Sequence, residues 1–262
     1  MVIRRIREHV ATHDWFAVLV DVGIVVLGVF LGTQVNNWNQ ERLDAGRARE
    51  YRARLIDELD FNTRQYALQT AYYRRAKDHG LKALAALDGS RPLPDRDFVI
   101  AAYQLTQTDT TKSKTGVYDE MIAAGLGERL GDAETQQIAS DFYLSGEVSQ
   151  RTNEIIFPYR TLLREAMPYA TQIRIREECG DRNVSYKGRL IGVATVSPCP
   201  MVIAAPEAQS AAAAVKSIPD VQHQITRYLA SLDEKIDNLA LAAQQADAFR
   251  KRLLLAARRR SA

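Results

Sequence analysis

Residues 16–35 read FAVLVDVGIVVLGVFLGTQV, and the rest of this 262-residue chain is interpreted outward from them. Asp21 is the only charged residue in the run. About 20 apolar residues in a helix, at about 1.5 Å per residue, match the ~30 Å hydrocarbon core of a bilayer. Trp15 and Trp38 flank the run, as aromatic residues do at the two membrane interfaces. The sequence therefore predicts a transmembrane anchor at residues 15–38.

Two other interpretations of the apolar run are open. A basic start followed by apolar residues also fits a cleaved signal peptide, but the run is long for one and no good Ala-x-Ala cleavage site follows it. The second alternative is a buried helix in a soluble core. We expect an uncleaved, single membrane span, because no second apolar run of spanning length follows.

Residues 1–14 are predicted to form a basic amphipathic tail. Val2, Ile3, Ile6 and Val10 fall roughly on one helical face, and the basic residues of the tail are Arg4, Arg5 and Arg7. Such a segment suits an anionic membrane surface and favours a cytoplasmic N-terminus. More arginines follow the span, but long domains cross a membrane with little regard to charge. The expected location is a bacterial inner membrane, with the C-terminal domain in the periplasm.

One face of the predicted span combines an acid with two glycines. Asp21, Gly28 and Gly32 lie within about 40° of one another on a helix, and Gly28 and Gly32 form a G-x-x-x-G pair that lets two backbones approach closely. The sequence therefore predicts a helix–helix contact here; the alternative is a chance arrangement in which Asp21 reaches the interface. The amides and aromatic that follow are predicted to mark the helix–water boundary: Gln34, Asn36, Asn37, Trp38 and Asn39.

Residues 39–262 are predicted to form a helical soluble domain, so the fold class is mainly α. No proline occurs between 39 and 87, which predicts that the anchor continues as one long helix. Residues in steps of four and three mark a coiled-coil-like seam on it: Leu55, Leu59, Asn62, Tyr66, Gln69, Tyr73, Ala76, Gly80, Ala83 and Leu87. A second seam runs from Ile225 to Ala257, and the two long helices are expected to pack as an antiparallel pair in a bundle.

Shorter helices are expected at 97–107, at 117–126, and from Asp132, a predicted N-cap, to about Phe157. Residues 106–115 form a polar loop rich in threonine, and residues 204–215 form an alanine-rich helix or linker. Residues 171–203 contain the one convincing β-leaning stretch, a predicted β-hairpin. Cys179 and Cys199 flank it and are predicted to form a disulfide, which fits the periplasm; the alternative is two unrelated buried thiols.

Composition and motifs point to no particular chemistry. A net charge of +3 with interleaved acids and bases is too small to indicate nucleic-acid binding, and no catalytic or nucleotide-binding motif is found. Asp57, Glu58 and Asp60 are interpreted as a solvated helix face rather than an acid pair. His9 and His13 lie four apart and could share a metal, but no third ligand is fixed nearby. We therefore predict no cofactor, no metal, no catalytic residue and no nucleic-acid partner.

Two segments resemble a family of uncharacterised bacterial membrane proteins. Residues 21–41, DVGIVVLGVFLGTQVNNWNQE, are similar to a family signature in which an acid opens an apolar helix and a Gln-x-Asn-Asn-Trp-Asn run closes it. Residues 118–125, YDEMIAAG, with the later pair Phe142 and Tyr143, are similar to a second family segment. The two segments cover under a fifth of the chain. The resemblance implies a membrane anchor with a helical, periplasmic domain, and implies no activity.

These observations favour a membrane-anchored interaction or scaffold module of the bacterial envelope. The expected partners are membrane lipid, a second copy of the chain in a homo-oligomer, and another, unidentified envelope protein. The alternative hypothesis is a ligand-sensing subunit that signals through its transmembrane helix to a membrane partner. An enzyme of unknown chemistry is a third class, for which the sequence supplies no motif.

Overall fold

The structure is a computed structural model that describes residues 15–153 and 157–259. Within these residues the protein is mainly α-helical, with one two-stranded antiparallel sheet. The predicted fold class, a long N-terminal helix followed by further helices and a small β-hairpin, is confirmed. The contacts of the chain separate two units, Met1–Tyr51 and Arg52–Ala262. The predicted basic tail, with His9 and His13, lies outside the described residues.

The first described element is the helix α2, Trp15–Leu87, which is continuous as the lack of proline predicts. In the first unit its apolar side chains face outward: Leu27 is 60% exposed and Phe30 is 55% exposed. Among the residues that the structure describes, α2 is the one helix long and apolar enough to cross a membrane, judged by length and composition. This supports the predicted anchor, while the kind of membrane and the orientation stay predictions.

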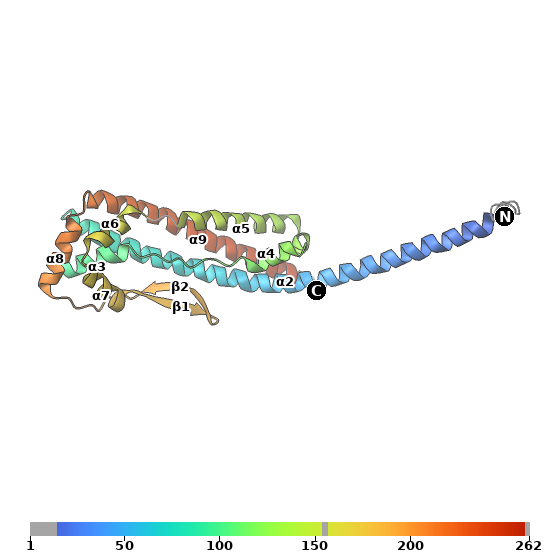
Figure 1. Cartoon of the computed structure of the whole chain (residues 1–262), viewed down its shortest axis with the longest axis horizontal. Helices are drawn as coiled ribbons and strands as arrows, with labels where there is room; N and C mark the ends of the chain where they lie inside the picture. The colour runs from blue at the N-terminus through green and yellow to red at the C-terminus, as the bar shows by residue number, and fades with distance from the viewer. Residues whose placement is uncertain (1–14, 154–156, 260–262) are drawn as a thin grey trace, which may run out of the picture. The chain divides into compact units, whose positions relative to one another are not determined.

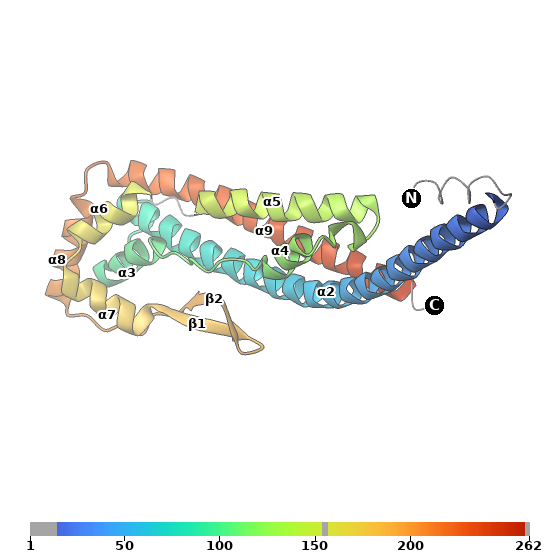
Figure 2. The same cartoon turned by 45° about the vertical axis from the view of Figure 1, so that its right-hand side comes forward.

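In the second unit, α2 packs against the last helix, α9 (Val221–Arg259), in antiparallel fashion (Figures 1 and 2). Gln222 donates a hydrogen bond to the Leu87 carbonyl, 2.9 Å. The Lys77 ammonium lies 2.5 Å from the Asp233 carboxylate. Residue numbers therefore rise along one helix as they fall along the other, as the two seams predict. Nine of the ten seam positions on α2 are buried, Leu87 being the exception.

The other helices complete the bundle and close its far end. Their bounds are α3 Asp95–Leu105, α4 Gly116–Ala123, α5 Ala133–Asn153, α6 Pro158–Ala166, α7 Tyr169–Cys179 and α8 Ala205–Lys216, with a short 3-10 turn at Gly127–Arg129. α5 runs beside α9 in both views, and α3, α6, α7 and α8 gather where α2 ends (Figures 1 and 2). The alanine-rich segment is thus a helix. Pro158 begins α6, since proline is tolerated in the first turn.

The β-hairpin is shorter than the predicted segment 171–203. Its strands are β1, Asp181–Tyr186, and β2, Arg189–Thr195. The preceding residues belong to α7, because Thr171, Ile175 and Cys179 are buried at helical spacing. Alternating isoleucines at 173 and 175 imitate a strand only over a short window. The prediction of β structure before residue 180 is therefore wrong.

Gly192 lets the hairpin approach the bundle. Its φ of +148° is one that side-chain-bearing residues rarely adopt, and a Cβ there would lie 2.7 Å from a carboxylate oxygen of Asp109. The Asp109 carboxylate accepts a hydrogen bond from the Val193 N–H, 3.3 Å. Tyr72 of α2 donates to Asp181 of β1, 2.8 Å, and burial raises the pKa of that carboxyl group. The hairpin is thus fixed along α2 by polar contacts at its base.

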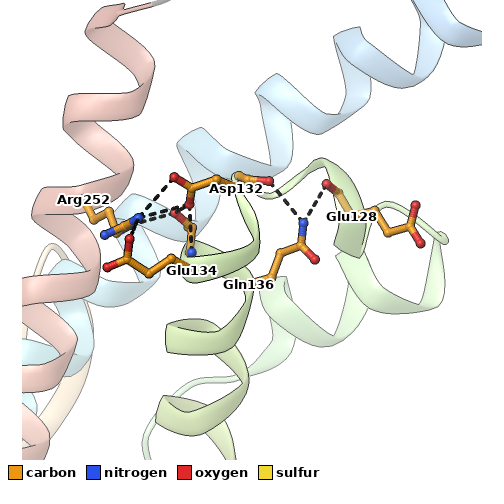
Figure 3. A network of polar contacts seen from close by, with 7 residues as sticks. Glu128, Asp132, Glu134, Gln136 and Arg252 are labelled. Carbon is orange, nitrogen blue, oxygen red and sulfur yellow. Dashed lines mark hydrogen bonds and ion pairs between the residues drawn. The ribbon is translucent and has the colours of Figure 1, made fainter.

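Asp132 caps α5, as predicted, and also ties α5 to α9 (Figure 3). Its carboxylate accepts hydrogen bonds from the Thr135 N–H, 2.9 Å, and the Thr135 hydroxyl, 2.5 Å. Arg252 of α9 donates to Asp132 and to Glu134. The contacts with Thr135, together with the Arg252 guanidinium, lower the pKa of Asp132 to about 2. The carboxylate therefore stays ionised, and keeps both roles, through the whole physiological pH range.

Gly80 gives a direct test of the α2–α9 packing. A Cβ at this position would lie 2.7 Å from methyl groups of both Leu105 and Leu229. Replacing Gly80 by Leu should lower the free energy of unfolding by about 1–3 kcal/mol, because the core would be overpacked. The matched control is Gly46→Leu in the same helix, where the nearest atom is 4.0 Å away. Equal effects of the two substitutions on chemical denaturation would contradict this packing.

Candidate functional site

The candidate site is built on an extended segment, residues 109–115, which together with the first two residues of α4, 116 and 117, we call the strap. The strap joins α3 to α4 and follows α2 without belonging to any sheet. Five polar residues of α2 hold its backbone, and we call them the polar ladder: Glu58, Asn62, Gln65, Gln69 and Tyr73. They recur every three or four residues and therefore share one face of the helix. All five are buried.

Asn62 makes the closest pairing in the ladder. Its amide donates to the Lys114 carbonyl, 2.7 Å, and accepts from the Lys114 N–H, 2.8 Å. Gln65 and Gln69 both donate to the carbonyl of Thr111, at 3.0 and 2.8 Å. A buried backbone group without a partner costs about as much as a lost hydrogen bond. The ladder therefore supplies to the strap what a neighbouring β-strand would otherwise supply.

Tyr73 holds the beginning of the strap. Its hydroxyl donates to the Asp109 carbonyl and accepts from the Asp109 N–H, both at 3.1 Å. The Asp109 carboxylate also accepts from the Thr111 N–H, 2.8 Å, and from Val193 of the hairpin. Asp109 is therefore the residue at which the strap, the hairpin and α2 meet.

Glu58 holds the end of the strap, and its predicted place on a solvated face is wrong. The residue is only 6% exposed. Its carboxylate accepts hydrogen bonds from the Val117 N–H and the Tyr143 hydroxyl, both at 2.8 Å. Burial raises the pKa of Glu58, and the two hydrogen bonds oppose that shift. The interpretation as a solvated face suits Asp57, whose side chain is 77% exposed; Asp60 instead accepts from Tyr186 of the hairpin.

Aromatic rings gather around this carboxylate. Tyr118 of α4 stacks on Tyr143 of α5, with ring centroids 4.0 Å apart and ring planes 10° from parallel. Phe142 meets Tyr143 edge-on at 4.9 Å. The structure thus brings together Tyr118, Phe142 and Tyr143, which come from the two parts of the second segment of resemblance. Stacked and edge-to-face rings of this kind stabilise the contact between α4 and α5 beyond the area that they bury.

A pocket of about 410 Å³ lies between α2, the strap, α4 and α5. Its aromatic and apolar lining residues are Tyr66, Tyr118, Phe142, Tyr143 and Leu144. Its polar lining residues are Asn62, Ser113, Lys114, Thr115, Asp119 and Ser140. This volume is within the range of about 300–1,000 Å³ usual for small-molecule sites, which combine apolar walls with a few polar groups.

Two of the residues that line the pocket, Lys114 and Asp119, carry charges of opposite sign. The Lys114 ammonium lies 4.0 Å from the centroid of the buried Phe61 ring, which is not among the lining residues. Burial and the positive charge of Arg189 lower the pKa of Lys114, against a weaker opposite effect of Glu58. Asp119 accepts a hydrogen bond from the Thr115 hydroxyl, 2.7 Å. Across residues 15–153 and 157–259, neither Lys114 nor Asp119 has an ion-pair partner.

The residues predicted as sites in the first unit lie along α2. Asp21, Gly28 and Gly32 are exposed on the continuous helix, and a Cβ on either glycine would meet no atom within 4 Å. The boundary residues are exposed as well: Gln34, Asn36, Asn37, Trp38 and Asn39. Their helical spacing is as expected. The helix–helix contact and the boundary at the membrane both stay predictions.

Cys179 and Cys199 are paired in the structure, with Cα atoms 5.0 Å apart. Side chains of α3 hold the backbone at both cysteines. Gln104 donates to the Cys179 carbonyl, 2.7 Å, and Arg96 donates to the Cys199 carbonyl, 2.9 Å. The bridge thus closes the chain around the hairpin, and its formation in the cell stays a prediction.

In comparisons with known proteins, no family model, curated protein or solved structure matches this chain. Within the described ranges, no group of three His, Cys, Asp or Glu side chains is placed to hold a metal ion. Sequence reasoning missed Glu58, Tyr66 and Lys114 as parts of one site. The sequence did contain one indication of this site: Asn62 and Gln69 are polar although they occupy seam positions, which a purely apolar core would fill with apolar residues.

The Tyr143–Glu58 hydrogen bond can be tested by removing one oxygen. Tyr143→Phe should lower the free energy of unfolding by about 1–3 kcal/mol, because a buried carboxylate oxygen loses its donor. Tyr118→Phe is the matched control, since that residue contacts Tyr143 through its ring; its effect should stay within about 0.5 kcal/mol. Similar losses in urea denaturation of the two variants would show that the hydroxyl–carboxylate contact is not the stabilising one.

Proposed function

We propose that this protein is a membrane-tethered interaction module of the bacterial envelope. Its span anchors it in the inner membrane, with the N-terminus in the cytoplasm and the helical domain in the periplasm. Copies of the chain associate through the span, and the domain is presented to another envelope protein. The observation that carries the proposal is the exposed apolar helix of the first unit, with two open glycines on the same face as an acid.

The exposed face of the span supports association. A helix in lipid gains little from burying apolar side chains, so close backbone approach at glycines is a main source of helix–helix affinity. Gly28 and Gly32 have free space around them in the single chain. Asp21 on the same face is costly in lipid unless a partner or water reaches it. A second copy of the span would bury all three residues at once.

Two further features support the proposed location. Paired cysteines are typical of oxidising compartments such as the bacterial periplasm. The amides and Trp38 that follow the apolar run would meet lipid headgroups where the helix leaves the membrane. We also propose that the chain is related to the family of bacterial membrane proteins of unknown function that residues 21–41 and 118–125 resemble. Such a relationship implies an anchor and a helical periplasmic domain.

The pocket favours a second candidate function, that of a ligand-sensing subunit. One wall of the pocket is α2, the helix whose N-terminal part carries the proposed span. Glu58 of α2 is hydrogen-bonded both to the strap and to α5, which form other walls. A ligand in the pocket would contact all of these elements. In this role, a change in the position of α2 on ligand binding would pass through the span to a partner protein in the membrane. A partner is needed because only one span is predicted in the sequence.

Association through the span predicts a defined effect of substitution. Gly28→Leu combined with Gly32→Leu should weaken self-association in detergent micelles by about tenfold or more, because the bulky side chains keep the backbones apart. Gly23→Leu is the control, since this open glycine lies on another face of the same helix. Sedimentation equilibrium gives the association constant. An unchanged oligomer in the double variant would exclude this face as the contact.

The location is tested by labelling the two cysteines in spheroplasts with a membrane-impermeant maleimide. A periplasmic domain with an oxidised pair should be labelled only after a reductant has been added. The Cys179→Ser variant should be labelled without reductant, because the remaining thiol, Cys199, is partly exposed, whereas Cys179 is buried. Thiols that react only after lysis would place the domain in the cytoplasm, contrary to the proposal.

A further inference from the structure

The positive charge nearest to the aromatic pocket is held outside its lining. Lys114 contributes to the lining, but its ammonium lies 4.0 Å from the centroid of the Phe61 ring, and Phe61 does not line the pocket. Arg189 and Glu58 are the charged residues that act on this ammonium, and neither of them lines the pocket. The ammonium is therefore engaged by groups outside the lining, and it does not supply a cation for a ligand in the pocket.

Asp119 brings a negative charge to the lining itself. One oxygen of its carboxylate accepts the hydroxyl of Thr115, 2.7 Å, and Thr115 also lines the pocket. In the described part of the chain, this carboxylate has no other hydrogen-bond donor and no cation beside it. Burial and, after it, the charge of Asp119 raise the pKa of Tyr118, so the carboxylate is close enough to act on that residue. The pocket therefore has an unpaired negative charge next to one of its rings.

The aromatic lining of the pocket adds to the attraction for a positive charge. The Tyr143 hydroxyl donates to Glu58, and the Tyr66 hydroxyl is hydrogen-bonded to Ser113. These two hydroxyl groups are thus occupied, and the residues offer the pocket ring surface. Tyr118 is half-buried, and its stack with Tyr143 covers one face of its ring. The face of an aromatic ring is negative and attracts cations, more strongly where water is excluded. Rings beside an unpaired carboxylate favour a cationic ligand.

We propose that this pocket binds a small organic ammonium ion, whose positive group meets the Asp119 carboxylate and the Tyr118 ring. The apolar part of the ligand lies against Phe142 and Leu144, which also line the pocket. The volume of about 410 Å³ is sufficient for a small organic molecule. This inference names a ligand class for the second candidate function and rests on it. It does not depend on association through the span.

The test uses the full-length protein in maltoside micelles, which contain no ammonium group, and isothermal titration calorimetry at pH 7. Phenethylamine and choline are the cationic probes, and 2-phenylethanol and 3,3-dimethyl-1-butanol are their uncharged counterparts of similar shape. At least one cation should bind with a micromolar to low-millimolar Kd. Its counterpart should bind about fivefold or more weakly, because the contacts of the charge with ring and carboxylate are lost. Absence of binding by both cations, or equal binding of each cation and its counterpart, would overturn the proposal.

Two variants assign the binding to the pocket. Asp119→Asn should weaken binding of the cation about threefold or more, as expected for an exposed ion pair, and leave binding of the uncharged counterpart unchanged. Asp141→Asn is the matched control, because Asp141 is an exposed acid of α5 that does not line the pocket. Tyr118→Leu should weaken binding of the cation more than that of the counterpart, since it keeps apolar volume and removes the ring. Circular dichroism checks that each variant is folded. Wild-type affinity for the cation in Asp119→Asn would refute the assignment.

The same ammonium chemistry occurs in free amines and in the headgroup of phosphatidylethanolamine. Mixed micelles that contain this lipid distinguish the two sources. An unchanged affinity for the cationic probe identifies a free ammonium compound as the ligand. Competition by the lipid in the wild type, together with its absence in Asp119→Asn, identifies the headgroup as the ligand.

The association constant, measured with and without the bound probe, separates this proposal from the function on which it rests. Asp119-dependent binding together with changed association supports both. Asp119-dependent binding with unchanged association supports the ligand class and counts against sensing through the span. In the Gly28→Leu, Gly32→Leu variant, binding of the probe should equal that of the wild type. Loss of binding there would contradict a site confined to the second unit.

Discussion

The need of buried backbone groups for hydrogen-bond partners is the constraint on which the second unit depends. The strap is not paired with a strand of the described sheet, and α2 satisfies its N–H and C=O groups with side chains. This arrangement fixes the backbone of Lys114 and the position at which α4 begins. It therefore also fixes the Tyr118 stack and the pocket. The same side chains occupy seam positions, so α2 gives up apolar packing area at Asn62 and Gln69 in exchange for holding the strap.

Much of the fold was predictable from periodicity. Steps of four and three along α2 and α9 predicted which faces are buried and that the two helices pair in antiparallel fashion, because helix geometry converts spacing into direction. Asp132 as an N-cap was predictable from local chemistry. The start of the hairpin was not, because two isoleucines two residues apart fit a strand, whereas the burial of Ile175 and Cys179 fits a helix. Over so short a window, only tertiary contacts decide between them.

The pocket was not predictable, because its residues become neighbours only through long-range contacts. Glu58 lies 59 residues from Val117 and 85 residues from Tyr143, its two hydrogen-bond donors. Read locally, Glu58 stands between two other acids on a charged helix, a pattern typical of solvent-exposed positions. The sequence contained one relevant clue, since Tyr118 and the Phe142–Tyr143 pair belong to the segments of family resemblance. That these three residues contact one another is evident only in the folded structure.

The polar ladder forms its hydrogen bonds with backbone atoms of the strap and not with the strap's side chains. The identity of Thr111, for example, does not affect the carbonyl that Gln65 and Gln69 bind. The ladder therefore constrains the residue type little at 111, whereas Asp109 also acts through its carboxylate. At such positions the side chain can be exchanged while the path of the backbone stays the same. One scaffold can in this way acquire different specificities during evolution.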